Sequence, residues 1–162
     1  NTETGELTNK QLAVTSENPS FITFSPNKNY IYAVGEGKSS SVSAFRIIEG
    51  GQLQLINKVD SNGKGPCHIS VNKTGDHAVV SNYGGGTVSI YSINNDGALN
   101  EASQVFNHNV DSIISHAHSA QFYKDELYVS DLFLLILALI KEELMYFLME
   151  LIRLVLLRLL KS

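Results

Sequence analysis

The stretch PSFITFSPNKNYIYAV (residues 19–34) occurs a second time, without a gap, as PCHISVNKTGDHAVVS (66–81). A third copy, two residues shorter, reads AHSAQFYKDELYVS (117–130). In the first two copies a polar turn, SPNKN or NKTGD, separates two short runs that are rich in β-branched and aromatic residues. Such runs on either side of a turn are typical of antiparallel strands. We therefore expect a β-hairpin in each copy.

Two other units recur between these copies. SSSVSAFRI (39–47) matches GGTVSIYSI (85–93). The other unit, built around a leucine, occurs as TGELTNKQL (4–12), GGQLQLINKV (50–59) and DGALNEASQV (96–105). Leu7, Leu53 and Leu99 are 46 residues apart each time. A β-rich repeat of this length, punctuated by Gly, Asn and Asp, is typical of β-propeller blades with four antiparallel strands each. The predicted fold class is all-β, a partial propeller of about three blades.

The last part of the chain has a different character. Residues 132–162 are rich in leucine and contain no Gly, Pro, Asn or Asp. Leu144 keeps the blade register, 45 residues after Leu99, so we interpret the segment as a degraded blade or a packed helix. A helix on a membrane surface and a damaged coding sequence are the alternatives. The longest uncharged apolar run, 132–140, is shorter than the ~20 residues that cross a bilayer. The predicted domains are thus the blades (1–131) and the Leu-rich segment (132–162).

Composition narrows the class of protein. The net charge of −4 is modest and the basic residues are scattered, which argues against nucleic acid as a partner. The single cysteine, Cys67, excludes an intramolecular disulfide and fits a reducing compartment. The chain begins NTETGELTNK, without a basic region followed by an apolar one, so we expect no signal peptide. These features predict a cytoplasmic protein that does not bind a membrane.

Three motifs carry a resemblance to a known family: GKGPCHISVNKTGDHAVVSNYGGGTVSIYSI (63–93), SHAHSAQF (115–122) and LYVSDL (127–132). Together they resemble the lactonase β-propeller family, which includes propeller-type 6-phosphogluconolactonases and, as relatives, 3-carboxymuconate lactonizing enzymes. The resemblance implies a ring of seven blades, from which this chain would supply the part from late blade one to early blade four. The chain departs from the family pattern in QFYKDELYV, which lacks a turn with Pro and Gly, and after SDL, where Leu and Phe replace Gly and polar residues.

The resemblance also implies a function. In the full-length protein we expect hydrolysis of a sugar lactone of the 6-phosphogluconolactone type, in the pentose phosphate pathway and without a cofactor. The groups that hold the oxyanion and the phosphate would come from the remaining blades. Two alternatives stay open: a propeller that binds a ligand or partner without catalysis, and an inactive gene fragment. Because about three blades cannot close a ring, we also expect the chain by itself to associate through its exposed sheet edges.

The candidate site follows from the aligned repeats. Ser20, Cys67 and His118 occupy one column, directly before the core of the first strand of each blade. Opening a lactone with water requires a base, a role that suits a neutral imidazole, and the resemblance assigns that role to His118. We expect the following residues to contact the substrate: Glu36, His68, Asn82, Tyr83, His116 and Asp131. His68 lies one residue after the column, so its side chain could point the other way.

Each of these residues also has a simpler interpretation. His118 could be a hydrogen-bonded strand cap, and Glu36 and Asp131 could be acceptors at strand ends. His116 and His118 alternate along one strand face and could bind zinc, but no second pair with metal spacing accompanies them, so we predict no metal. Cys67 lacks a recognised partner base and is interpreted as a small buried filler. The glycines of SNYGGG either let the backbone approach a ligand or form a tight connection.

Overall fold

The computed structural model describes residues 2–8, 10–124 and 126–132, which form three antiparallel sheets. The first sheet contains β1 (Pro19–Phe24), β2 (Tyr30–Gly35), β3 (Ser41–Ile47) and β4 (Leu53–Asp60), with a short 3-10 turn, η1 (Glu49–Gly51), before β4. The second contains β5 (Pro66–Val71), β6 (His77–Asn82), β7 (Thr87–Ile93) and β8 (Leu99–Asn107). The third is a hairpin of β9 (Ala117–Tyr123) and β10 (Glu126–Asp131). In both complete sheets the strands lie in chain order, which confirms the predicted four-stranded antiparallel blades.

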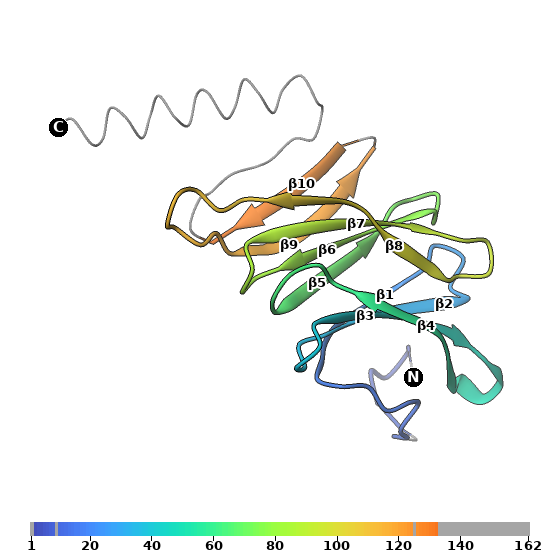
Figure 1. Ribbon diagram of the computed structural model, residues 1–162. Coiled ribbons are helices and arrows are strands. Elements are labelled where there is room, and N and C mark those ends of the chain that lie inside the picture. Colours follow the sequence, from blue (N-terminus) through green and yellow to red (C-terminus); the bar gives the residue numbers. More distant parts are fainter. Residues whose placement is uncertain (1, 9, 125, 133–162) are drawn as a thin grey trace.

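The three sheets are stacked one against the next (Figure 1). The middle sheet is buried on both faces, because Ile69, Ala78 and Val80 pack against the first sheet while Val79 and Val88 pack against the hairpin. Successive residues of a strand point to opposite faces, so a strand buried on both sides must be apolar at nearly every position. This explains why the sequence HAVVSN of β6 shows no alternation of apolar and polar residues.

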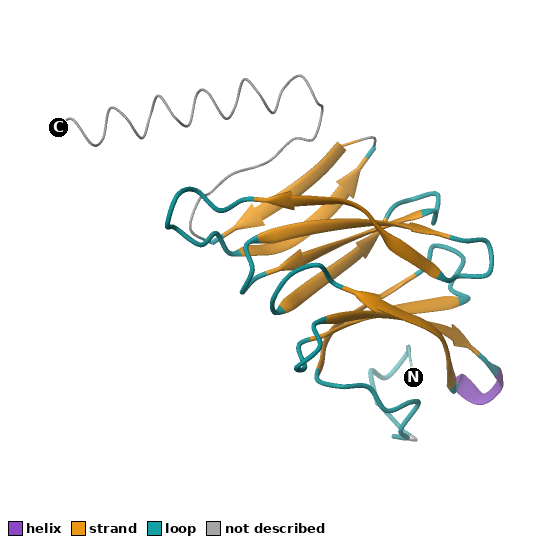
Figure 2. Ribbon diagram, in the orientation of Figure 1, coloured by secondary structure: helices purple, strands orange, loops and turns teal. Residues whose placement is uncertain are grey.

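Loops gather at two opposite ends of the stack (Figure 2). At one end the first strand of each sheet begins and the second strand finishes; we call it the mouth end. The pairs Pro19–Gly35, Pro66–Asn82 and Ala117–Asp131 mark it in the three sheets. The turns between β1 and β2, β5 and β6, and β9 and β10 lie at the other end. All the predicted site residues lie at the mouth end, either within the strands near that end or in the loop residues that directly adjoin them.

The first strand of every sheet opens with a β-bulge. The pairing register shifts between Pro19 and Phe21 and between Pro66 and His68, and in β9 the residues Ala117 and Ser119 pair with neighbouring residues of β10. The extra residues are therefore Ser20, Cys67 and His118, the three members of the predicted column. A bulge bends the strand and lets two consecutive side chains point in similar directions. Bulges are frequent next to active sites.

The first copy of the leucine unit forms no strand over its described residues, 4–8 and 10–12. Residues 4–12 match the sequence of β4 and β8, yet the described residues 2–8 and 10–18 contain no strand, and Leu7 is 96% exposed. In the two complete sheets this unit pairs with the third strand, β3 or β7. The residues that follow it contact the first sheet, where Ala13 O accepts a hydrogen bond from Leu53 N (3.3 Å) and Asn18 O accepts one from Glu36 N (3.1 Å).

The predictions for the Leu-rich segment fall almost entirely outside the described residues, which end at Leu132. They remain predictions. Within the part of the chain that the structure describes, no helix has the length and apolar character needed to cross a membrane.

Candidate functional site

Three ring side chains meet at the mouth end, between the second sheet and the hairpin. The ring of His116 is stacked on Tyr83, with centroids 4.4 Å apart, and His118 lies edge-on to Tyr83 at 5.9 Å. His116 Nδ1 lies 3.0 Å from the carbonyl oxygen of Tyr83, which can only accept a hydrogen bond. Nδ1 must therefore carry a proton, and in the neutral ring the lone pair is on Nε2. Tyr83 and His118 are exposed, so this aromatic cluster faces solvent.

Asp131, at the end of β10, holds the segment that carries both histidines. Its carboxylate is buried and accepts hydrogen bonds from the hydroxyl of Ser115 and from the backbone N–H of His116 (3.1 Å). Leu132 N donates a further bond to the carbonyl of His116 (3.1 Å). The structure thus favours the interpretation of Asp131 as an acceptor at a strand end, rather than as a group that reaches a ligand.

Asn82, at the end of β6, has a similar place. Its side chain is fully buried, and Nδ2 donates to Ser61 O (2.9 Å) and to Thr87 Oγ1 (3.0 Å). The loop backbone passes so close that a Cβ on Gly63 would lie 2.5 Å from the Cβ of Asn82. Asn82 therefore anchors the loop that leads into β5, and its donors are engaged there.

His68 is buried between β5 and β9. Its Nδ1 accepts a hydrogen bond from the backbone N–H of Ala120 (3.3 Å), so the proton of the neutral ring is on Nε2, which lies 3.2 Å from the side-chain amide of Gln121. The ring also contacts Phe21 at 4.4 Å. Burial lowers the pKa of His68, and the nearby charge of His118 lowers it further. The structure thus gives His68 a contact between sheets.

The column residues connect each sheet to the next. Ser20 Oγ donates to the carbonyl of Pro66 (3.3 Å), and Cys67 Sγ donates to the carbonyl of His118 (3.3 Å). Cys67 and His68 both reach β9, which is the effect of the bulge on their directions. Burial raises the pKa of the Cys67 thiol, as suits a small interior filler. His118 holds the same position on the hairpin, and its side chain is exposed.

Glu36 directly follows β2, on the first sheet. Its side chain is exposed just after β2, and its backbone N–H is bonded to Asn18 O. The negative charge of Glu36 adds to the effect of burial in raising the pKa of Cys67, so the two groups are neighbours at the mouth end. The six residues expected to contact the substrate therefore divide into exposed groups and buried anchors. Glu36, Tyr83 and the partly exposed His116 form the first kind, and His68, Asn82 and Asp131 form the second.

The glycines of SNYGGG fit neighbouring loops closely. Gly85 N donates to Lys64 O (3.0 Å), and a Cβ on Gly85 would lie 2.7 Å from Lys64 N. Gly86 has a φ of +62°, and a Cβ there would lie 2.7 Å from Ser115 O. These contacts support the interpretation of a tight connection. Asn109, which no sequence motif indicated, links the same loops: Nδ2 donates to Gly85 O (3.0 Å), and Oδ1 accepts from Ser115 N (2.8 Å).

The histidines of this end form no evident metal centre. Over the described ranges, the structure contains no group of three or more His, Cys, Asp or Glu side chains placed to hold an ion. At this end an exposed imidazole, His118, lies beside an aromatic wall made by Tyr83 and His116.

Comparison with known proteins adds a family match. The model of the family described as "Lactonase, 7-bladed beta-propeller" matches residues 1–132. A 6-phosphogluconolactonase of Formosa agariphila is 31% identical over 144 residues, which cover 82% of this chain and 41% of that protein. A 6-phosphogluconolactonase of Bacillus subtilis is 28% identical over 100 residues, covering 60% and 29% respectively. The chain thus spans at most about two fifths of the length of these relatives.

Solved structures agree. The crystal structure of a putative 6-phosphogluconolactonase from Bacteroides uniformis matches with a TM-score of 0.65 and 30% identity, over 74% of this chain and 38% of that one. The periplasmic gluconolactonase of Pseudomonas aeruginosa matches with a TM-score of 0.67 and 27% identity, also over 74% and 38%. Both likenesses confirm the stacked blades as part of a propeller.

Proposed function

Since this chain belongs to the lactonase family of seven-bladed β-propellers, we propose that the whole protein hydrolyses a sugar lactone, with 6-phosphogluconolactone as the substrate class. The names of the relatives support lactone hydrolysis as the activity. The observation that carries the proposal here is His118, an exposed imidazole on a strand bulge at the mouth end, lying edge-on to Tyr83.

The reaction needs few groups. A water molecule attacks the carbonyl carbon of the lactone while the base, His118 in this proposal, removes a proton from that water. The tetrahedral intermediate carries its negative charge on the former carbonyl oxygen. When the intermediate collapses, the bond between the carbonyl carbon and the ring oxygen breaks. The ring oxygen then takes a proton, which His118 can return, and the product is the open-chain sugar acid. Donors that stabilise the oxyanion are expected from other blades of the ring.

The neighbours of His118 have distinct proposed roles. Tyr83 and His116 form a wall on which the substrate can rest. Glu36 offers an acceptor from the first sheet. Asn82, Asp131 and His68 support the loops and strands behind these groups. We propose that the reaction uses neither a metal nor a cofactor.

The place of the reaction is also proposed. Phosphogluconolactone hydrolysis belongs to the pentose phosphate pathway, and we propose a cytoplasmic location on the evidence of the single cysteine and the charge pattern. The structural likeness to a periplasmic enzyme means that the compartment must be measured, for example by fractionating cells that express the full-length protein.

The decisive experiment replaces His118 in the full-length protein and follows acid release from 6-phosphogluconolactone above the uncatalysed rate. We expect His118→Ala to lower kcat about 10²- to 10⁴-fold, the usual contribution of a general base. His77→Gln, an exposed histidine at the opposite end of the sheets, is the matched control and should retain full activity. Unchanged turnover in His118→Ala would remove the proposed base. Tight lactone binding without turnover by the wild-type protein would indicate a binding propeller, and neither binding nor turnover would indicate an inactive one.

A further inference from the structure

The last residue of the second strand occupies an equivalent position in all three sheets. Gly35, Asn82 and Asp131 each pair with the first residue of the first strand, which is Pro19, Pro66 or Ala117. Each of the three therefore lies beside the loop that leads into its own sheet. Two of these residues, Asn82 and Asp131, are among those expected from sequence to contact the substrate.

The contact with that loop differs from sheet to sheet. At Gly35 the loop backbone comes so close that a Cβ would lie 2.8 Å from Glu17 O. At Asn82 an amide donates to the carbonyl of Ser61 (2.9 Å). At Asp131 a carboxylate accepts from the Ser115 hydroxyl and from His116 N–H. Only in the hairpin does the loop present two donors, and only there is the facing residue a group with two acceptor oxygens.

The consequence for the aromatic cluster follows from the backbone. The peptide groups around His116 are fixed on both sides, because its N–H is bound to Asp131 and its carbonyl to Leu132 N. The ring of His116 is fixed against Tyr83. His118 is two residues further on, in the bulge whose neighbour Ala117 pairs with Asp131. Hydrogen bonds to a buried carboxylate are stronger than those between neutral groups.

We propose that Asp131 is a positioning residue, which sets the backbone of the segment 115–118 and thereby the orientation of the His116 and His118 rings. Asp131 then contacts neither the substrate nor the reacting water. This inference rests on the proposed lactone hydrolysis for its catalytic consequence, whereas its structural part stands on the hydrogen bonds alone. It replaces the sequence-based expectation that Asp131 contacts the substrate.

Two substitutions in the full-length protein separate the possible roles. Asp131→Ala removes both acceptors, and we expect kcat to fall about 10- to 100-fold with KM changed less than about threefold, as for a misplaced catalytic group. Asp131→Asn should stay within about fivefold of the wild-type kcat, because the amide oxygen can still accept from His116 N–H while the amide N–H donates to the Ser115 oxygen. Asp96→Asn, an exposed carboxylate at the opposite end, is the control for loss of charge.

The other outcomes overturn the proposal. If Asp131 were an acid or base in the reaction, Asn would be as inactive as Ala. If it bound the substrate, both variants would raise KM by about tenfold or more while the kcat of Asp131→Asn remained normal.

A second readout does not depend on activity. Backbone amide exchange at His116, followed by NMR, should be at least about tenfold faster in Asp131→Ala than in the wild-type protein, and restored in Asp131→Asn. If the wild-type protein lacks lactonase activity, the proposed function fails, while this exchange rate still decides the positioning role. Equal exchange in wild type and both variants would refute it. If Asp131→Ala does not fold, the Asp131→Asn variant decides alone. Slow amide exchange at His116 in Asp131→Asn, together with loss of lactonase activity in that variant, would refute the positioning role as well.

Discussion

At the scale of one residue, the buried imidazole of His68 makes the contact between two sheets dependent on pH. Its Nδ1 accepts from Ala120 N–H, and a protonated ring would place a second N–H against that donor. Burial, and then the charge of His118, lower the pKa of His68 in the folded protein. The unfolded chain therefore takes up the proton first as pH falls. The stability due to neutral His68 is present above the ordinary histidine pKa of about 6.5 and is lost as pH falls from there toward the lower folded pKa.

This gives a prediction for acid stability. The free energy of unfolding of the full-length protein should fall between pH 7.5 and pH 5, and His68→Gln should reduce that slope. At pH 7.5 the variant should be less stable by about 1–2 kcal/mol, because the buried contact with Ala120 is disturbed. Urea unfolding at a series of pH values measures both quantities. Part of the slope should persist, since burial also lowers the pKa of His108.

Ser103→Ala, which removes an exposed hydrogen bond on β8 and no titratable group, is the control and should keep the wild-type slope. A His68→Gln protein with an unaltered slope would show that the imidazole does not carry this pH dependence.

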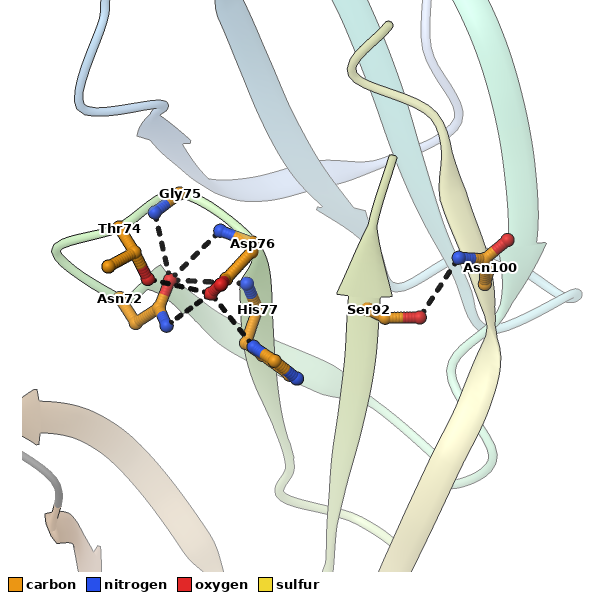
Figure 3. Close-up of polar contacts among 7 residues, drawn as sticks. All are labelled: Asn72, Thr74, Gly75, Asp76, His77, Ser92 and Asn100. Carbon is orange, nitrogen blue, oxygen red and sulfur yellow. Dashed lines mark hydrogen bonds and ion pairs between the residues drawn. The ribbon is translucent and has the colours of Figure 1, made fainter. Parts of the chain in front are cut away.

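At the scale of an element, the hairpin of β5 and β6 is closed by one asparagine. Asn72 Oδ1 accepts hydrogen bonds from the backbone N–H groups of Gly75, Asp76 and His77, at 3.0, 3.1 and 3.1 Å (Figure 3). Its Nδ2 donates to Asp76 Oδ1 (2.7 Å), which Thr74 and His77 also approach. Hydrogen bonds from Asn72, then Thr74 and His77, hold the pKa of the Asp76 carboxyl well below its usual range. The stability that this provides is present above pH ~4 and is lost as the pH falls below it.

We predict that Asn72→Ala raises the pKa of Asp76 toward its ordinary value and lowers the melting temperature at pH 7. The carboxyl carbon shift of Asp76, titrated by NMR, measures the first effect. Ser92→Ala removes another hydrogen bond at the same end, which Asn100 donates to Ser92 (2.9 Å) outside the Asn72 network, and should leave the Asp76 titration unchanged (Figure 3). If Asp76 titrates identically in Asn72→Ala and the wild type, the turn is held by other contacts.

The elements themselves were largely predictable from sequence. The matched copies at 19–34, 66–81 and 117–130 each form the expected hairpin, since short β-rich runs and turn residues are local properties. The segment 4–12 failed as a strand because a strand also needs a partner, which a local pattern does not supply.

The site was only partly predictable. Sequence alignment placed Ser20, Cys67 and His118 together, and the structure puts all three in bulges. Alignment could not show that His68 turns to the same side as Cys67, because one extra residue in a strand alters the expected alternation. Nor could alignment show that Asn82 and Asp131 are buried. A polar residue at a strand end gives the same sequence pattern whether its side chain faces a loop or a ligand.

At the scale of the whole molecule, two complete sheets and a hairpin form an arc. Ile22 and Phe24 on β1 are each 53% exposed, and among the described residues β10 pairs with β9 alone. Exposed apolar side chains and open strand edges favour association between copies.

We therefore predict that the 162-residue chain, expressed by itself, forms dimers or larger species at tens of micromolar, by sedimentation velocity. Ser130→Lys, which adds a charge to the exposed edge of β10, should reduce this association. Ser112→Lys, at an exposed turn outside the strands, is the matched control and should not. A stable monomer with lactonase activity would contradict both this prediction and the need for a closed ring.

The contacts made by the column residues have a direction, and that direction bears on synthesis. Ser20 reaches forward to Pro66, and Cys67 reaches forward to His118, so each blade offers its donor to a blade that leaves the ribosome later. During synthesis the blades would therefore complete their contacts in chain order. In the most recently made blade, the donor of the column residue would still lack its acceptor. If the pattern holds in the full-length protein, His118 gains its final surroundings only after translation has passed well beyond it, and the protein would become active late in its own biogenesis.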